Sequence, residues 1–462
     1  INREAPGKFI FTDPYDYVIT PIEEFHFTNT LSPITNLSYN TAGDKTQGED
    51  HFKAKFGVNV GKRLGLGFNF DYLYGLGYYS NQSTSHTNYQ VYGSYLGDQY
   101  QAHLIFSALH QKVTENGGLL DDNYITHPEH FDDEYESLEM PVVLEKNWNR
   151  NTSQRLFFTH RYSLGFNRRV QMSEEEIAAR KFALESKKEN DALKAKEEAQ
   201  RQASKQGNIF DEEAYEKQNQ PMGGRPEGAK IVGEEPVLVE ATDTNRIAVV
   251  AGQEPIEAIA KTEEAPVDST WMKTEYVPVT SFIHTLQFDH YNRIYEAFAT
   301  PDNYYKNQYD VTEKFQLDSI YDKTSHIMLR NTFAVALLEG FNKWAKAGLK
   351  IFAAHEYRRF RLPSAAGFAT FNESTVSIGG QLSKQQGKLL HYGVTAEAFL
   401  AGSDAGSVYL DADADLNFKM FGDTLQFAAN AFFHQSTPTF YYRHYQSRHF
   451  WWDQEDMDNT IH

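Results

Sequence analysis

The chain has 462 residues, a formal net charge of -19 at pH 7 and a mean hydropathy of -0.60, which disfavours nucleic acid as a partner and argues against a bundle of membrane helices. It contains no apolar stretch of about eighteen residues, so no transmembrane helix is predicted. The chain has no Cys, which excludes disulfide bonds and thiolate metal sites, but 33 Phe and 28 Tyr make it rich in aromatic residues.

Long alternating segments begin near the N-terminus and recur throughout the chain. In residues 63–80, RLGLGFNFDYLYGLGYYS, the even positions from Leu64 to Tyr78 are large and apolar, and the odd positions are mostly Gly, Asn and Asp. The same period of two residues occurs in a series of further segments: 51–60, 100–108, 155–167, 282–290, 326–338, 347–358, 374–384, 388–400, 408–420 and 424–434. Roughly thirteen such segments, each about ten to eighteen residues long, exceed the usual strand length of about 5 to 6 residues.

The alternation alone leaves two interpretations open, because a soluble β-sandwich with one wet face also shows it. A strand that crosses the hydrocarbon layer at a tilt needs about 9 to 11 residues, which the segments meet or nearly meet. Tyrosines gather at segment ends, as at Tyr78 and Tyr79 or Tyr441 and Tyr442, where a membrane barrel has its aromatic girdle. We therefore predict an all-β fold, a transmembrane antiparallel up-and-down β-barrel.

Tight and long connections alternate between these segments. The tight turns lie at 62–65, 97–99, 341–345, 384–387 and 422–424. The connections that are longer or richer in aromatic residues include 114–151, 301–322 and 361–367. Outer-membrane barrels have short periplasmic turns and long outer loops, so the long connections are predicted to lie outside the cell.

One connection, residues 169–277, breaks this rule because it is long and falls on the periplasmic side. Ser173 and Glu176 have the spacing of a capping box at the start of a charged helix, and Gly207 offers its end. Residues 208–275 are expected to be largely disordered, with a short strand at IAVVAG (247–252). Alternatively, residues 169–277 are a tolerated insertion that has no function of its own.

The chain is thus predicted to have four parts. Residues 1–24 form an N-terminal periplasmic or barrel-entry segment, and residues 25–168 form the first part of the barrel. Residues 169–277 form the charged periplasmic insertion, and residues 278–462 form the second part of the barrel. The chain opens with INREAPGKF, so we expect any export signal to precede it.

The parity of the alternation assigns strand residues to two faces. The polar face is predicted to line a water-filled pore and includes Lys53, Lys55, Asn59, Asn69, Asp71, Gln101, His103, Arg155, Arg161, Asp289, Arg330, Lys350, Glu356, Arg358, Glu397, Asp411, Asp413, Asp415 and Lys419. The apolar face is predicted to contact lipid and includes Leu64, Leu66, Phe68, Phe70, Tyr72, Leu410, Leu416, Phe418, Leu425 and Phe427. Opposed rows of Arg and Asp would create a transverse field that favours small polar solutes.

Catalytic, cofactor and metal motifs are weak, so we predict no enzyme activity, no cofactor and no metal site. Asp411, Asp413 and Asp415 resemble the start of a calcium loop, but Leu416 stands where that loop needs glycine, which favours a row of residues on a strand. The HPEH sequence at 127–130 offers metal ligands without the HExxH spacing, which favours an acidic outer loop.

Four stretches resemble the putative porin family of Bacteroidota: REAPGKFIFTDPYDY (3–17), FTNTLSPITNLSYNTAGDKTQGEDHF (27–52), GYYSNQSTSH (77–86) and DDNYITHPEHF (121–131). The resemblance implies an outer-membrane β-barrel made with a secretory signal, and the family name implies a pore. Compared with a complete member, the chain is expected to lack an N-terminal portion and the final strands. About 16 strands are therefore predicted in the whole protein, of which roughly thirteen are visible here.

Two functions follow as expectations. The first is a porin-like channel in the bacterial outer membrane for passive diffusion of small hydrophilic solutes, in contact with lipid and lipopolysaccharide. The second is a plugged or structural barrel of an outer-membrane assembly or transport complex, which binds protein partners through residues 169–277. Single-channel conductance discriminates between them.

Overall fold

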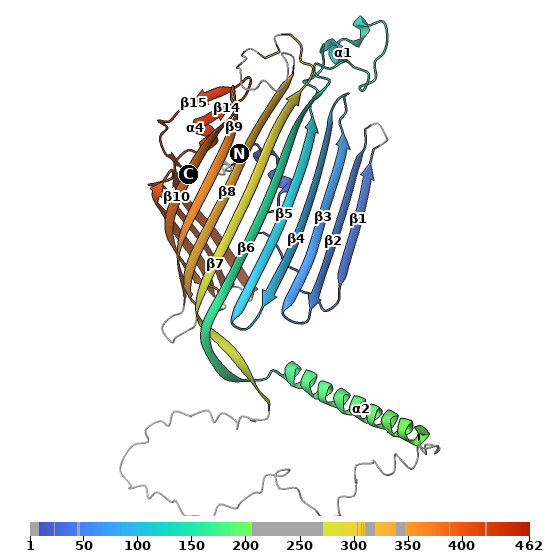
Figure 1. Ribbon diagram of the computed structural model, residues 1–462, viewed down its shortest axis with the longest axis vertical. Helices are drawn as coiled ribbons and strands as arrows, with labels where there is room; N and C mark the ends of the chain where they lie inside the picture. The colour runs from blue at the N-terminus through green and yellow to red at the C-terminus, as the bar shows by residue number, and fades with distance from the viewer. Residues whose placement is uncertain are drawn as a thin grey trace, which may run out of the picture. The chain divides into compact units, whose positions relative to one another are not determined.

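The computed structural model describes residues 9–22, 24–43, 47–205, 271–302, 304–305, 307, 309, 319–338, 347–387, 389–420 and 423–462. The chain divides into two compact units. The first unit consists of residues 1–166 and 276–462 and contains the sheet (Figure 1). The second unit consists of residues 167–275 and contains a long helix. The predicted division into four functional parts remains a prediction: 1–24, 25–168, 169–277 and 278–462.

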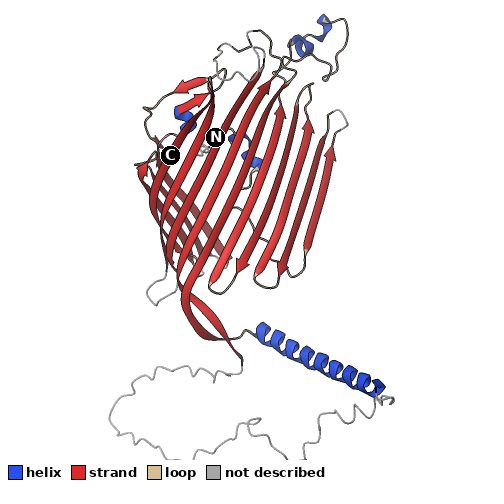
Figure 2. Ribbon diagram, in the orientation of Figure 1, coloured by secondary structure: helices blue, strands red, loops and turns tan. Residues whose placement is uncertain are grey.

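The first unit is built on one antiparallel sheet of fourteen strands, in which sequence neighbours are also spatial neighbours (Figure 2). The strands follow one another in the order β1 (Ile34–Ala42), β2 (Glu49–Val60), β3 (Leu64–Leu76), β4 (Ser83–Leu96), β5 (Tyr100–Thr114), β6 (Asn147–Gln171), β7 (Met272–Ala297), β8 (Ile320–Leu337), β9 (Gly348–Ser364), β10 (Gly367–Lys384), β11 (Leu390–Gly402), β12 (Val408–Met420), β13 (Asp423–Ser436) and β16 (Thr460–Ile461). The sheet is curved, and no pairing between described residues joins β1 to β13 or β16. This meander confirms the predicted all-β, up-and-down barrel architecture.

The strands differ from the predicted segments at several places, among them β4, which no predicted segment covers. β1 lies outside the predicted alternating segments, because the large apolar residues of its ITNLSYNTA sequence, Ile34, Leu37 and Tyr39, do not share one face. β6 and β7 have 25 and 26 residues, well beyond the predicted 155–167 and 282–290. The predicted turn at 341–345 lies outside the described residues. The predicted disordered stretch 208–275, with its IAVVAG strand, also lies outside them, except for residues 271–275 at its end.

The register of the ladder gives the sheet two chemically different faces. Phe68 lies opposite Phe56 on β2 and Val91 on β4, and these side chains are 37%, 41% and 49% exposed. The next residue, Asn69, points to the other face, because successive strand residues alternate. We call this second face, which the N-terminal segment 9–30 contacts, the inner face, and the other the outer face.

The main aromatic core lies on the inner face. It contains Phe9, Phe360, Leu362, Phe440, Tyr441 and Tyr445, all of them buried. The Phe360 and Phe440 rings stack with their centroids 3.9 Å apart, and Phe9 stacks on Tyr291 at 5.1 Å. Phe440 and Tyr441 belong to the short helix α4 (Phe440–Arg443), which leads into a small hairpin of β14 (His444–Gln446) and β15 (Trp451–Asp453). Apolar side chains are thus exposed outside and packed inside, as in a barrel whose outer surface faces lipid.

The second unit, taken by itself, contains the helix α2 (Glu174–Lys205). The Ser173 backbone N–H donates to Glu176 Oε2 at 3.0 Å, and the Glu176 N–H donates to Ser173 Oγ at 3.2 Å. These reciprocal bonds confirm the predicted capping box. Across the described part of the chain, no helix combines the length and the apolar character needed to cross a membrane.

The start of α2 should loosen in acid. Lys273 donates a hydrogen bond to Glu176, and this bond, together with the one from Ser173, holds the pKa of Glu176 below its usual value of 4.5. A lowered folded pKa means that the stabilisation is present above pH 4.5 and is lost as pH falls through the lower, folded value. Amide protection at Ser173 and Glu176, corrected for intrinsic exchange, should therefore fall below pH 4.5.

Two substitutions control this experiment. Glu176→Gln should remove the pH dependence, whereas Glu175→Gln, at an exposed neighbouring position, should retain it. Equal acid sensitivity in both variants would show that Glu176 does not control the helix start.

Candidate functional site

The N-terminal segment 9–30 crosses the inner face of the sheet. At one end, Phe9 packs against Tyr291 of β7. Farther along, after the 3₁₀-helix η1 (Asp13–Val18), Asn88 Nδ2 donates a hydrogen bond of 3.2 Å to the Val18 carbonyl. At the other end, the Thr30 N–H donates to Asn59 Oδ1 of β2 at 2.9 Å. A single stretch of chain therefore connects strands on two distant parts of the sheet.

Aromatic rings fix the middle of this segment to β4 and β5. Phe25 and Phe27 lie edge-on to Tyr92, with ring centroids 5.0 and 5.8 Å apart, and Phe27 also contacts His103 at 4.9 Å. Gly67 on β3 makes room for this arrangement, because a Cβ at that position would lie 2.1 Å from the Tyr92 ring. The glycine of the alternating stretch thus allows close packing on the inner face.

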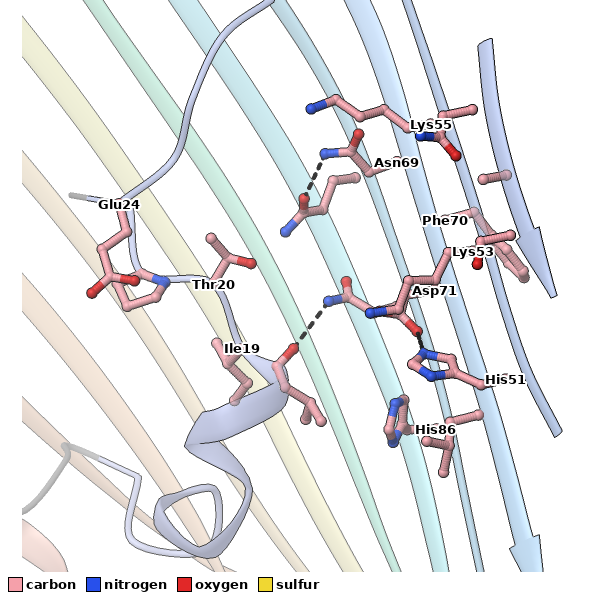
Figure 3. Close-up of a pocket in the computed structure, with 18 residues that line it drawn as sticks. Ile19, Thr20, Glu24, His51, Lys53, Lys55, Asn69, Phe70, Asp71 and His86 are labelled. Atoms are coloured by element: carbon pink, nitrogen blue, oxygen red, sulfur yellow. Dashed lines mark hydrogen bonds and ion pairs between the residues drawn. The ribbon is translucent and has the colours of Figure 1, made fainter. Parts of the chain in front are cut away.

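A cavity of about 1010 Å³ lies between this segment and the wall formed by β1 to β4 (Figure 3). The segment contributes residues 18–21 and Glu24. The strands contribute Asn36, Ser38, His51, Lys53, Ala54, Lys55, Asn69, Phe70, Asp71, Leu73, His86, Asn88 and Gln90. Most of these side chains are polar or charged, so the cavity favours hydrophilic molecules.

Asp71 is the centre of charge in the strand wall. Its Oδ1 lies 2.7 Å from His51 Nε2, and its Oδ2 lies 3.5 Å from Lys53 Nζ. Next to it, Asn69 Nδ2 donates to Gln90 Oε1 at 3.1 Å. Lys55 has no carboxylate partner among the residues that the structure describes. The wall therefore combines one shared carboxylate with a lysine that no described carboxylate neutralises.

A second polar cluster lies on β8 to β11 and is buried at its centre. Arg330 pairs with Glu356 at 3.3 Å and with Glu397 at 2.6 Å. Arg358 pairs with Glu373 at 3.1 Å and with Asp404 at 2.7 Å. The Glu356 and Arg358 side chains are 5% and 8% exposed. This network of two arginines and four carboxylates joins strands and the 403–406 turn.

The residues predicted to line a pore all lie on the inner face by register, but their surroundings differ. Those that border the cavity are Lys53, Lys55, Asn69 and Asp71. Those in ion pairs with one another on the inner face are Arg155, Asp289, Arg330, Glu356, Arg358 and Glu397. Those that contact the N-terminal segment are Asn59 and His103. The others are Gln101, Arg161, Lys350, Asp411, Asp413, Asp415 and Lys419.

The residues predicted to contact lipid lie on the outer face by register: Leu64, Leu66, Phe68, Phe70, Tyr72, Leu410, Leu416, Phe418, Leu425 and Phe427. Phe70 also borders the cavity, although its register places it on the outer face. None of the described side chains in this set is buried. The set is thus available for contact with a surrounding apolar phase.

The sequence interpretation missed the β4 part of the cavity and the N-terminal residues opposite it. A signal for β4 exists in HTNYQVYGSY (86–95), where His86, Asn88 and Gln90 alternate with larger or apolar residues. Residues 18–24 carry no such period, so their place on the inner face is a matter of tertiary packing.

The group of described residues that could hold a metal ion is His127, Glu129 and His130, in the connection between β5 and β6. This connection contains α1 (Asn123–Thr126) and the 3₁₀-helix η2 (Pro128–His130). His127 Nδ1 lies 3.0 Å from Glu129 Oε1, and all three side chains are exposed. Asp411, Asp413 and Asp415, in contrast, occupy alternate positions of β12, as predicted.

The fold and the outward apolar face define a transmembrane β-barrel of the bacterial outer membrane. A sequence profile of the family described as "Putative porin" matches residues 2–462, so the chain belongs to this family. No curated protein matches the chain.

Several solved structures are similar to this chain in part. The ferric-catecholate import receptor Fiu of E. coli K12, in its open form, is 7% identical, with a TM-score of 0.38 and coverage of 89% of this chain and 52% of the receptor. A mutant of the ferric enterobactin receptor PfeA of Pseudomonas aeruginosa is 8% identical, with a TM-score of 0.43 and coverage of 89% and 45%. The chain thus spans about half the length of each receptor.

Proposed function

We propose that this barrel is a channel for passive diffusion of small hydrophilic solutes across the outer membrane. The observation that carries the proposal is the hydrophilic cavity of about 1010 Å³ on the inner face. Its amides, hydroxyls and charged groups can replace the hydrogen bonds that a solute loses when it leaves bulk water. An apolar solute gains no such bonds, so the wall favours polar molecules.

The N-terminal segment narrows the proposed route. Hydrogen bonds hold it to the wall at Val18 and Thr30, and aromatic rings hold it at Phe9, Phe25 and Phe27. Passage is therefore proposed to occur beside this segment, along the wall that carries Lys53, Lys55 and Asp71, and not through the buried ion pairs of β8 to β11.

Conductance of the purified full chain in planar lipid bilayers tests the proposal. Discrete, ohmic current steps are expected in potassium chloride, and they should persist when residues 173–275 are deleted. A folded, membrane-inserted chain that gives no current would contradict passive diffusion.

A plugged or structural barrel is the second candidate. Two observations favour it: the N-terminal and C-terminal segments pack on the inner face, and residues 167–275 form a compact unit of their own. In α2, Phe182 and Leu193 are 71% and 59% exposed, and they are available to a protein partner. Loss of co-purifying proteins after deletion of 173–275, in a barrel without current, would support this candidate.

A further inference from the structure

We propose that the cavity on β1 to β4 is a binding subsite for a small hydroxylated solute that carries one carboxylate or phosphate group. This inference rests on the proposed function for its biological meaning, since the solute would bind on its way through the barrel. The binding itself is a property of the cavity and can be measured without any current. Its volume of about 1010 Å³ is at the upper end of the range of about 300–1,000 Å³ usual for small-molecule sites.

The charge of the strand wall favours an anion. His51, Lys53 and Lys55 lie at alternate positions of β2, and Asp71 on β3 lies opposite Lys53, whereas Asn69 lies opposite Lys55. Asp71 is already shared between His51 at 2.7 Å and Lys53 at 3.5 Å. Lys55 therefore presents an ammonium group without a carboxylate partner among the described residues. The chain as a whole has a formal net charge of -19, so a cluster of basic groups at one cavity wall contrasts with its overall negative charge.

Two buried polar atoms at the same wall have no hydrogen-bond partner among the described residues. His86 is only 4% exposed, yet its Nδ1 makes no hydrogen bond, and neither does Asn69 Oδ1. A buried polar atom without a partner is unfavourable, so such atoms normally bind water or a ligand. Both residues border the cavity (Figure 3), so rotation of either side chain would bring its buried atom to a solute, to which His86 would donate and from which Asn69 would accept a hydrogen bond.

The N-terminal segment forms the wall opposite the lysines, and its charge restricts the solute to a single anionic group, which would lie near the lysines. Figure 3 shows Glu24 and Thr20 of the N-terminal segment across the cavity from Lys55 and Asn69. A carboxylate at Glu24 repels a second anionic group and accepts hydrogen bonds from hydroxyls. The cavity thus matches an anionic head at β2 and a hydroxylated body toward the N-terminal segment.

Calorimetric titration of the detergent-solubilised full chain with gluconate, a hydroxylated carboxylate, tests this assignment, and glucose is the neutral control. Gluconate should bind and glucose should bind at least about tenfold more weakly, as expected when a charge-assisted hydrogen bond is lost. Lys55→Gln should weaken gluconate binding by about tenfold, whereas Lys62→Gln, in the exposed turn before β3, should leave it unchanged. Phosphate competition then shows whether the subsite also accepts that head group.

A gain of affinity provides the control against misfolding. Asp71→Asn removes the carboxylate that competes for His51 and Lys53, so gluconate should bind more tightly to this variant. Equal affinity for gluconate and glucose, or no change in Lys55→Gln, would overturn the subsite. Absence of current with intact gluconate binding would instead contradict the channel proposal and leave the subsite supported.

Discussion

Replacing Phe68 by arginine should prevent most of the chain from assembling in lipid bilayers. Phe68 lies in an outward apolar row with Phe56 and Val91 on the neighbouring strands. A cationic side chain on the lipid face of a barrel costs about 2–4 kcal/mol near the bilayer midplane. The fraction of folded protein in liposomes, measured from the heat-dependent shift of its band in gel electrophoresis, should fall accordingly.

The adjacent residue provides the matched control. Asn69→Arg introduces the same charge one position along β3, but on the inner face, at the border of the cavity. This variant should assemble like the native chain. If both arginine variants assembled equally well, the assignment of the outer face to lipid would be wrong.

Replacing Arg358 by methionine should lower the stability of the barrel unit more than any change of an exposed arginine. Arg358 is buried and lies within ion-pair distance of Glu356, Glu373 and Asp404. Removal of one partner of a buried ion pair costs about 3–5 kcal/mol, because the remaining charges stay uncompensated. The midpoint of urea unfolding in detergent micelles should shift to a distinctly lower concentration.

Arg359→Met is the control for this prediction. Arg359 is the next residue of β9, has the same charge and is exposed on the outer face. Its substitution should change the midpoint little. Equal midpoints for the two variants would mean that the buried network does not stabilise the fold.

The period of two residues made much of the sheet predictable, because it follows directly from strand geometry. Phe68 and Asn69 could be assigned to opposite faces from parity alone, and so could Arg358 and Arg359. The surroundings of Arg358 could not be predicted. They depend on Asp404 in a turn and on α4, whose Arg443 donates to Glu373, and these contacts join residues far apart in sequence. A periodic pattern carries no information about such contacts.

The candidate cavity was predictable to a similar degree. Alternation placed Lys53, Lys55, Asn69 and Asp71 on one wall, which is where they lie. Residues 18–24 could not be placed opposite them, because an irregular segment has no repeating pattern and is positioned by a few hydrogen bonds and aromatic contacts.

The N-terminal segment also has a mechanical consequence. It crosses the curved sheet from Phe9, which packs against β7, to Thr30, which is hydrogen-bonded to β2. A curved sheet that is held together only by hydrogen bonds between adjacent strands can flatten or become elliptical in cross-section under lateral pressure from the bilayer. A segment that connects its two sides keeps them at a fixed separation. The same residues that narrow the interior thus act as a brace that helps to preserve its cross-section.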